Sequence, residues 1–226
     1  MAASHLPRIY PILDVAQWKA RAPEARSSLS SLMHFAEELM EGGAALIQYR
    51  NKSGTAREIL GHARELRRLT RERARLIVND RIDLCLAAGG DGVHLGQDDL
   101  SPAAARQIAE SVARGEPGAV LEAGFWIGFS THCLEQVREA DGMPVDYIAV
   151  GPVFATGSKA NPDPVIGVEG VRRARGATAK PLVAIGGITR ENCGRVIEAG
   201  ADSVAVISDL VQSPRKAMRE FLDILR

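Results

Sequence analysis

The chain has 226 residues, 46% of them hydrophobic and 25% charged, a composition typical of globular proteins and not of disordered or fibrous ones. Lys plus Arg and Asp plus Glu number 28 each, and aromatic residues make up only 4%, which argues against nucleic acid or an anionic membrane as a partner. No apolar run is long enough to cross a bilayer, and the N-terminal residues lack the pattern of a secretory signal.

The three cysteines, Cys85, Cys133 and Cys193, are scattered along the chain without a Cys-x-x-Cys pair. An odd count without paired spacing argues against a disulfide framework or a structural zinc site. Free thiols in a reducing compartment are the simplest explanation, so we expect a cytoplasmic protein.

Eight short apolar runs rich in β-branched residues recur along the chain and predict strands. They lie at residues 8–13, 44–49, 75–79, 91–95, 125–129, 146–150, 181–185 and 202–207. Most runs are continuously apolar and not alternating, which is typical of parallel strands covered by helices. Between them lie segments with helical spacing, at 27–43, 55–74, 101–114, 189–201 and 213–226.

The ends of these helical segments carry the expected residues. Ser101-Pro102 and Ser213-Pro214 each place a capping hydroxyl before a proline in the first turn. Gly42-Gly43 and Gly200 end helices just before the next strand. Local chemistry and hydrophobic spacing therefore predict the same alternation of strands and helices.

Eight strand–helix repeats in a chain of this length predict a (β/α)8 TIM barrel that forms a single domain over residues 1–226. The alternative is an open doubly wound sheet, which also alternates strands with helices but seldom needs eight strands at this length. We expect the Gly- and Ala-rich segment 113–125 to be an extended loop between the fourth and fifth repeats.

Polar residues follow nearly every predicted strand, at the end where barrel enzymes place their sites. They are Gln48–Lys52 after the second run, Asn79-Asp80 after the third, Gly96–Asp99 after the fourth, Ser130–His132 after the fifth, Gly151–Lys159 after the sixth, Gly186-Gly187 after the seventh and Ser208 after the eighth. Solubility alone does not require polar groups at one end of the strands. The asymmetry therefore predicts an active site there.

The types of these residues suggest two binding sites for phosphate. Arg50, Lys52 and Lys159 supply positive charge on one side of the predicted mouth. Gly186-Gly187 and the Ile207-Ser208 turn follow strands seven and eight, where barrels commonly bind phosphate through backbone N–H groups.

Two carboxylates, Asp80 and Asp99, lie among these cationic residues. Such acids are poorly explained beside phosphate unless a cation links them to the ligand. Mg²⁺ held by one or two carboxylates, phosphate oxygens and water fits this pattern. The sequence therefore predicts a diphosphate–Mg²⁺ site opposite the second phosphate.

Several neighbouring residues have simpler structural explanations. Arg81, Asp83 and Asp98 are expected to be charges at helix starts or on the surface. His94 lies inside an apolar run, as expected of an imidazole that is hydrogen-bonded in the core. The basic run 64–75 mixes Glu with Arg and is expected to be a solvated helix face.

Seven motifs in order resemble the thiamine phosphate synthase family over almost the whole chain. They are QYRNK, VNDR, GVHLGQDDL, GFSTH, DYIAVGPVFATGSK, AIGGI and GADSVAVIS. The resemblance implies a small barrel enzyme that joins hydroxymethylpyrimidine diphosphate to hydroxyethylthiazole phosphate and releases pyrophosphate, with Mg²⁺ as cofactor. It also implies a dissociative substitution, in which the pyrimidine C–O bond breaks first and the thiazole nitrogen then adds.

The resemblance implies a role for each matched residue. The pyrimidine diphosphate is expected to bind Gln48, Tyr49, Arg50, Asn51, Lys52 and Asn79, with Ser130 on the pyrimidine or the departing pyrophosphate. The thiazole phosphate is expected at Thr156, Ser158, Gly187, Ile207 and Ser208, and Lys159 is expected to reach the pyrophosphate. Asp80 and Asp99 are expected to bind Mg²⁺, and Arg50, Lys52, Ser130 and Lys159 to act in catalysis.

Three residues depart from the family's usual pattern. Asn51 stands where the family usually has Glu, Ala155 where it has Pro, and Ser158 where Thr is common. The segment 159–167 also contains two prolines. These departures concern closure of the loop over the site more than the reaction.

Other functions on the same fold are the alternatives. A thiazole tautomerase would share the thiazole phosphate site and a histidine after strand five, here His132, but would lack the two aspartates. A non-catalytic protein that binds thiamine precursors would have no use for a diphosphate–Mg²⁺ site, and a sugar-phosphate isomerase would need a placed base. The expected partners are the two small-molecule substrates, with a homodimer left open, and neither nucleic acid nor a membrane.

Overall fold

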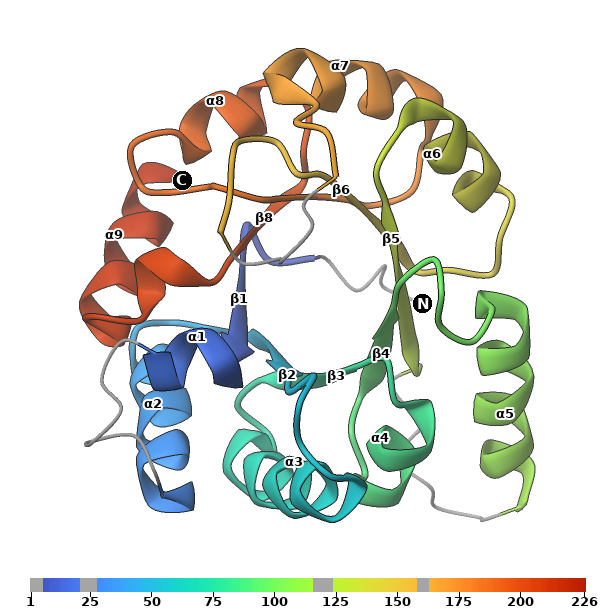
Figure 1. The fold of residues 1–226 in the computed structure, drawn as a ribbon, viewed down its shortest axis with the longest axis vertical. Coiled ribbons are helices and arrows are strands. Elements are labelled where there is room, and N and C mark those ends of the chain that lie inside the picture. The colour runs from blue at the N-terminus through green and yellow to red at the C-terminus, as the bar shows by residue number, and fades with distance from the viewer. Residues whose placement is uncertain (1–5, 21–27, 116–123, 158–162) are drawn as a thin grey trace.

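The computed structural model describes residues 6–20, 28–115, 124–157 and 163–226. Within them, eight parallel strands close into one barrel in chain order (Figure 1). The strands are β1 (Ile9–Asp14), β2 (Leu46–Arg50), β3 (Arg75–Asn79), β4 (Gly92–Leu95), β5 (Trp126–Thr131), β6 (Tyr147–Val150), β7 (Leu182–Ile185) and β8 (Ser203–Val206). Because β1 pairs with both β2 and β8, the predicted barrel is confirmed and the open sheet is wrong.

Helices surround the barrel and connect successive strands (Figure 1). They are α1 (Val15–Ala20), α2 (Leu29–Glu41), α3 (Ala56–Thr70), α4 (Ile82–Ala88), α5 (Pro102–Gly115), α6 (Leu134–Asp141), α7 (Gly167–Ala177), α8 (Cys193–Glu198) and α9 (Pro214–Ile224), with a 3₁₀ turn at Ser208–Leu210. The Ser101 hydroxyl accepts a hydrogen bond from the Ala104 N–H at 3.3 Å, which confirms the predicted start of α5.

Two expectations about the chain between elements are only partly met. The loop predicted at 113–125 falls largely on residues outside the described ranges, and α5 continues three residues into it. The prediction of a single domain over residues 1–226 stays a prediction for the same reason. Cys85, Cys133 and Cys193 are all free thiols, as expected. None of the helices described is long and apolar enough to cross a membrane.

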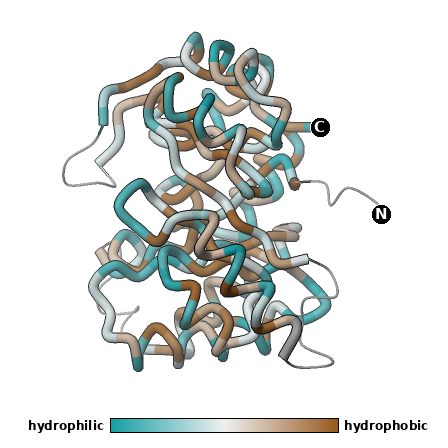
Figure 2. Tube along the Cα trace, turned by 90° about the vertical axis from the view of Figure 1, so that its right-hand side faces the viewer, coloured by the Kyte–Doolittle hydropathy of each residue, from teal (hydrophilic) through white to brown (hydrophobic). Residues whose placement is uncertain are grey.

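The core has two layers. The larger layer lies between the strands and the helices and includes Leu39 and Leu66, both fully buried. Figure 2 shows the resulting pattern, with hydrophobic and hydrophilic residues alternating along the outer helices. The second layer fills the barrel itself and includes Tyr10 and Tyr147. Gly128 makes room for it, because a Cβ at that position would lie 2.0 Å from the Tyr147 ring.

The amino end of the barrel repeats one arrangement three times. An aspartate directly before β4, β6 or β8 accepts hydrogen bonds from a helix arginine and from a backbone N–H of the preceding strand, at 2.6–2.9 Å. The sets, here called the three Arg–Asp staples, are Asp91 with Arg67 and Leu76, Asp146 with Arg106 and Ile127, and Asp202 with Arg175 and Leu182. Each staple ties a helix to two neighbouring strands, so we expect this end of the barrel to serve stability.

Candidate active site

A cavity of about 570 Å³ opens at the carboxyl ends of the strands, where the sequence placed the site. Every strand contributes a residue to its wall: Ile12, Gln48, Asn79, His94, Ser130, Ala149, Val183 and Ala205, in chain order. The cavity continues down to Tyr10 on the inner layer of the barrel. It is therefore deep as well as open, with room for two ligands placed end to end.

Charged side chains gather on the wall above β2 and β3. Arg50 ends β2, and its guanidinium donates to the carboxylate of Asp14, which is buried at the end of β1. Asp14 also accepts a hydrogen bond from the Gln17 N–H at 2.9 Å, which fixes its position at the start of α1. Arg50 is thus held in place by a carboxylate that is itself anchored to the backbone.

Asp80 stands next to Lys52, with Nζ and Oδ2 2.6 Å apart. Its backbone is left-handed, with φ of 61°, and its N–H donates to the carbonyl of His94 at 2.8 Å. Aspartate is among the few residues other than glycine that adopt this conformation readily. A backbone held in that region directly after a strand directs the Asp80 side chain into the cavity and is typical of functional sites.

Asp99 approaches Asp80 from the loop after β4. The two carboxylates are within hydrogen-bonding distance, and one oxygen of Asp99 accepts the Gly96 N–H at 2.7 Å. Burial raises the pKa of Asp80; the hydrogen bond from Lys52 opposes this shift, and the neighbouring Asp99 adds to it. No cluster of three or more His, Cys, Asp or Glu that could hold a metal occurs within the described ranges, so a cation here would need ligand or water oxygens as well.

A chain of hydrogen bonds crosses the floor of the cavity. Gln48 Nε2 donates to the Tyr10 hydroxyl at 2.9 Å, and the Tyr10 and Tyr147 hydroxyls lie 2.8 Å apart. Tyr147 then meets His94 Nδ1 at 3.0 Å, and His94 Nε2 meets the Ser130 hydroxyl at 2.9 Å. The prediction that His94 is a hydrogen-bonded core imidazole is confirmed. We call these five residues the floor relay.

The wall above β6 to β8 contains two adjacent glycines, and we call it the wall of backbone and glycine. Gly186 and Gly187 have φ of 102° and 64°, and the loop after β6 packs directly against them. Phe154 donates its N–H to the Gly186 carbonyl at 2.9 Å, and a Cβ on Gly187 would lie 2.5 Å from the Ala155 carbonyl oxygen. Only glycine leaves space for this close approach of two loops.

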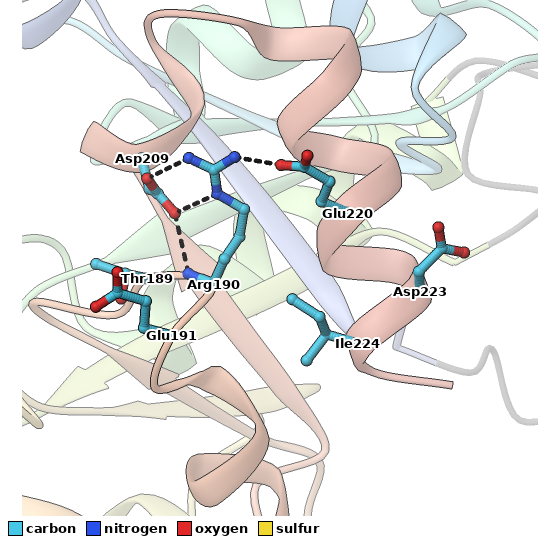
Figure 3. A pocket seen from close by; sticks show the side chains of 7 residues that line it. All are labelled: Thr189, Arg190, Glu191, Asp209, Glu220, Asp223 and Ile224. Atoms are coloured by element: carbon cyan, nitrogen blue, oxygen red, sulfur yellow. Dashed lines mark hydrogen bonds and ion pairs between the residues drawn. The ribbon is translucent and has the colours of Figure 1, made fainter.

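A second hollow lies on the outer side of this wall, beside α9 (Figure 3). At its centre Arg190 binds both carboxylate oxygens of Asp209 at 3.0 Å and also contacts Glu220 of α9. The Arg190 N–H donates to Asp209 as well, at 3.0 Å. Asp209 directly follows Ser208, so this arginine fixes the loop after β7 against the turn after β8.

The structure brings most of the predicted site residues together. Those that line the cavity are Gln48, Arg50, Lys52, Asn79, Asp80, Asp99, Ser130, Thr156, Gly187, Ile207 and Ser208. Ser158 and Lys159 lie outside the described residues. The exposed Arg81 and Asp83 pair with each other at 2.6 Å, so they are surface charges, as expected.

Tyr49 and Asn51 are not among the residues that line the cavity. Side chains alternate across a strand, so Tyr49 points away from the cavity into the helix layer, where its hydroxyl meets His62 Nδ1 at 2.8 Å. Asn51 donates to that hydroxyl at 3.3 Å and accepts the Gly54 N–H at 2.9 Å. Both side chains are engaged behind the wall, so a contact with the substrate would be made by their backbone, and it stays a prediction.

Sequence reasoning missed several residues of the site. Asp14 directly follows the first apolar run, and that position alone could have identified it. Tyr10 and Tyr147 sit within apolar runs and look like core residues until the hydrogen bonds between them are seen. His132, which the sequence placed at the mouth without a role in the synthase, lines the cavity with Nδ1 2.7 Å from the Gly151 carbonyl oxygen.

Known proteins with similar sequences and structures have this architecture. Residues 22–210 match a family model described as thiamine monophosphate synthase. A thiamine-phosphate synthase from Koribacter versatilis is 54% identical, over 97% of this chain and 96% of its own, and one from Methanospirillum hungatei is 43% identical over 86% and 90%. The solved thiamine phosphate pyrophosphorylase from Pyrococcus furiosus superposes with a TM-score of 0.77 at 33% identity, over 96% of this chain and 95% of its own.

Proposed function

The chain belongs to the thiamine monophosphate synthase family, and from that premise we propose how its cavity joins two phosphorylated substrates. The protein is a transferase that forms thiamine phosphate, as its thiamine-phosphate synthase relatives are named to do. The observation that carries the proposal is that one cavity has the cations Arg50 and Lys52 at the end of β2 and the turn Gly186-Gly187 at the end of β7. Each wall suits one of the two substrates.

The pyrimidine diphosphate is assigned to the charged wall. Arg50 and Lys52 would bind its diphosphate, with Asn79 beside them. Lys159, which lies outside the described residues, is proposed to reach the pyrophosphate on resemblance alone. Gln48 and Ser130 lie at the two ends of the floor relay and would contact the pyrimidine ring. The support is their shared position on the cavity wall and the burial of Asp14, which holds Arg50 there.

The thiazole phosphate is assigned to the wall of backbone and glycine. Gly187, Ile207 and Ser208 line the cavity at the ends of β7 and β8, the usual place for phosphate in this fold. Thr156 would add a hydroxyl from the loop after β6, and Ser158 is proposed on resemblance alone. Arg190 supports this wall from behind by fixing the turn that contains Ser208.

Asp80 and Asp99 would hold Mg²⁺. Two carboxylates within hydrogen-bonding distance repel each other when both are ionised, and a divalent cation between them removes that repulsion. The residues present therefore fit the metal. The chemistry that Mg²⁺ supplies when bound is neutralisation of negative charge on the diphosphate.

The protein's own residues would act mainly by electrostatics and positioning. As the pyrimidine C–O bond breaks, the bonding electrons leave with pyrophosphate, and Arg50 and Lys52 face the growing charge. The thiazole nitrogen then donates its lone pair to the pyrimidine carbon. The deep cavity would hold the nucleophile beside this short-lived cation.

The cavity would need no strong general base for this reaction. The imidazole of His94 is engaged by Tyr147 and Ser130, and His132 faces the Gly151 carbonyl. We propose a cytoplasmic enzyme because both substrates are phosphorylated and all three cysteines are free thiols. A homodimer and the absence of nucleic-acid partners stay predictions.

A coupling assay tests the proposal. Purified protein is given both substrates with Mg²⁺, and release of pyrophosphate is followed together with formation of thiamine phosphate. The two products are expected in equal amounts and are expected to disappear when EDTA is added. Tight binding of thiazole phosphate without product would instead favour the tautomerase or a non-catalytic binding protein.

A further inference from the structure

We propose that Tyr10, Tyr147 and His94 are positioning residues that direct the proton of the Ser130 hydroxyl into the cavity, which makes Ser130 a hydrogen-bond donor to the pyrimidine substrate. The inference rests on the proposed function only in placing the pyrimidine at Ser130. It assigns a task to buried groups that do not themselves touch the reacting atoms.

The inner residues of the floor relay are fixed by packing. Tyr10 and Tyr147 are each 1% exposed, and His94 is 8% exposed. The His94 and Tyr147 rings stack at 5.6 Å, and Tyr10 meets Tyr147 edge-on at 5.8 Å. Burial raises the pKa of both tyrosines well above the usual value, so each hydroxyl keeps its proton at neutral pH.

The direction of the relay follows from its first member. Gln48 Nε2 can only donate, so Tyr10 accepts from it and has its own proton to give. Tyr10 then donates to Tyr147, Tyr147 donates to His94 Nδ1, and a neutral His94 carries its proton on Nε2. That proton goes to the Ser130 oxygen.

The opposite direction fails on the count of protons. Tyr10 would accept from both Gln48 and Tyr147, and its own proton would have no acceptor among the described residues. An unpaired buried donor costs about 1–3 kcal/mol. The relay is therefore expected to hold one direction, in which each tyrosine hydroxyl accepts one hydrogen bond and donates one.

The consequence appears at the two ends of the relay, where the cavity begins. At Ser130, the oxygen is occupied by His94, so the hydroxyl proton is available to a ligand; the Ser130 carbonyl is held separately by Gln97 at 2.5 Å. At Gln48, one of the two amide N–H groups donates to Tyr10, and the amide oxygen remains as an acceptor for a ligand. One donor and one acceptor match an aminopyrimidine, whose ring nitrogens accept and whose amino group donates.

Tyrosine-to-phenylalanine variants test this assignment, and the chain offers a matched control. Tyr147→Phe breaks the relay at its centre and is expected to raise the KM for the pyrimidine diphosphate by about three- to tenfold, the value of one hydrogen bond. The KM for the thiazole phosphate is expected to stay unchanged. Tyr49→Phe changes a tyrosine of the same 1% exposure, whose hydroxyl bonds His62 on the helix side, and neither KM should change.

A spectroscopic measurement tests the relay without any turnover. Histidine ¹⁵N NMR of the wild type is expected to show His94 protonated on Nε2, with the signal assigned by its loss in His94→Asn. A proton on Nδ1 would overturn the inference. So would equal rises in both KM values for Tyr147→Phe, because that pattern indicates a structural role.

The two proposals can fail separately. If the wild type forms no thiamine phosphate, the proposed function fails while the His94 tautomer still decides the relay. If Tyr147→Phe does not fold, Tyr10→Phe replaces it. The same rise in the KM for the pyrimidine diphosphate is expected, because Tyr10→Phe breaks the relay one step earlier.

Discussion

The two ends of this barrel both place aspartates beside basic side chains, but they arrange these charges differently. At the amino end, each aspartate of the three Arg–Asp staples has its own arginine and a strand N–H within 2.9 Å. At the carboxyl end, Asp80 and Asp99 crowd together, with Lys52 beside Asp80. Each charge of the staples is matched, whereas Asp99 adds a second carboxylate beside the Lys52–Asp80 pair.

This difference separates stability from function within one fold. Matched pairs at the amino end lower the energy of the folded chain without a ligand. Crowded carboxylates and a left-handed Asp80 at the carboxyl end raise it, and they are expected to be relieved when substrate and cation bind. Substitutions at the two ends should therefore change different measured quantities.

The largest effect is expected from Asp80→Asn. Asparagine tolerates the left-handed backbone, whereas alanine would add strain, so this variant removes only the charge. The rate of pyrophosphate release is expected to fall by about 100-fold or more. The melting temperature without Mg²⁺ should be no lower than that of the wild type, because the raised pKa of Asp80 shows that its charge is disfavoured in the fold.

The control is Asp83→Asn, which removes an exposed carboxylate paired with Arg81 nearby. It should leave the rate unchanged. Thermal melts with and without Mg²⁺ complete the test: the wild type should be stabilised by the ion and Asp80→Asn should not. A variant that retained a tenth of the activity would contradict the metal site.

Gly187→Ala should produce the next largest effect. Its φ of 64° and the Ala155 oxygen 2.5 Å from the new Cβ force the loop to move. The strain of about 1–2 kcal/mol corresponds to a rise of roughly tenfold in the KM for thiazole phosphate. Gly194→Ala, where a Cβ meets nothing within 4 Å, is the control on α8. An unchanged KM would show that the glycine wall does not bind the phosphate.

Asp91→Asn tests the amino end. Its carboxylate is only 13% exposed and accepts hydrogen bonds from Arg67 and from the Leu76 N–H. Loss of this carboxylate should lower the free energy of unfolding by about 1–3 kcal/mol. Urea denaturation measures this change, with the exposed Asp223→Asn expected within about 0.5 kcal/mol of the wild type. Both KM values should stay unchanged at a temperature where the variant is folded. A change in either KM for this variant would contradict the assignment of the amino end to stability alone.

The smallest effect is expected from Ser208→Ala. If the backbone N–H groups of the turn bind the phosphate, the loss of a hydroxyl should raise the KM for thiazole phosphate by less than about threefold. Steady-state kinetics with thiazole phosphate as the varied substrate measures it. A tenfold rise in this KM would show that side chains bind the thiazole phosphate. Both walls of the cavity would then bind phosphate through side chains.

The fold was predictable because strands and helices alternate regularly along the chain. Each observed strand begins and ends within two residues of its predicted bounds, since apolar runs and helix caps act locally. Residues that directly follow strands, such as Asn79 and Asp80, were predictable because parallel strands end on one face. The aspartates of the staples were visible too, at the starts of three runs, but their arginines lie 24 to 40 residues earlier on helices.

The rest depended on the third dimension. Tyr49 was expected at the site because the motif QYRNK is continuous, yet strand alternation turns it away from its neighbours Gln48 and Arg50. The pairing of Asp14 with Arg50 joins two strands and could not be read from either one. The floor relay joins residues more than a hundred positions apart, at Tyr10 and Tyr147, and neither run shows that the other is near.

The seam between β1 and β8 also has a consequence for how the protein is made. Ile9 pairs with Val204, so the strand that leaves the ribosome first finds its last neighbour only when nearly the whole chain has been synthesised. At roughly 5–20 residues per second, that interval is about ten to forty seconds. Throughout it one edge of β1 has unsatisfied backbone groups, and the Tyr10 hydroxyl lacks its partner until Tyr147, 137 residues later, has been synthesised. We therefore expect this edge of β1 to be the part of the nascent chain that most needs protection from wrong pairing during translation.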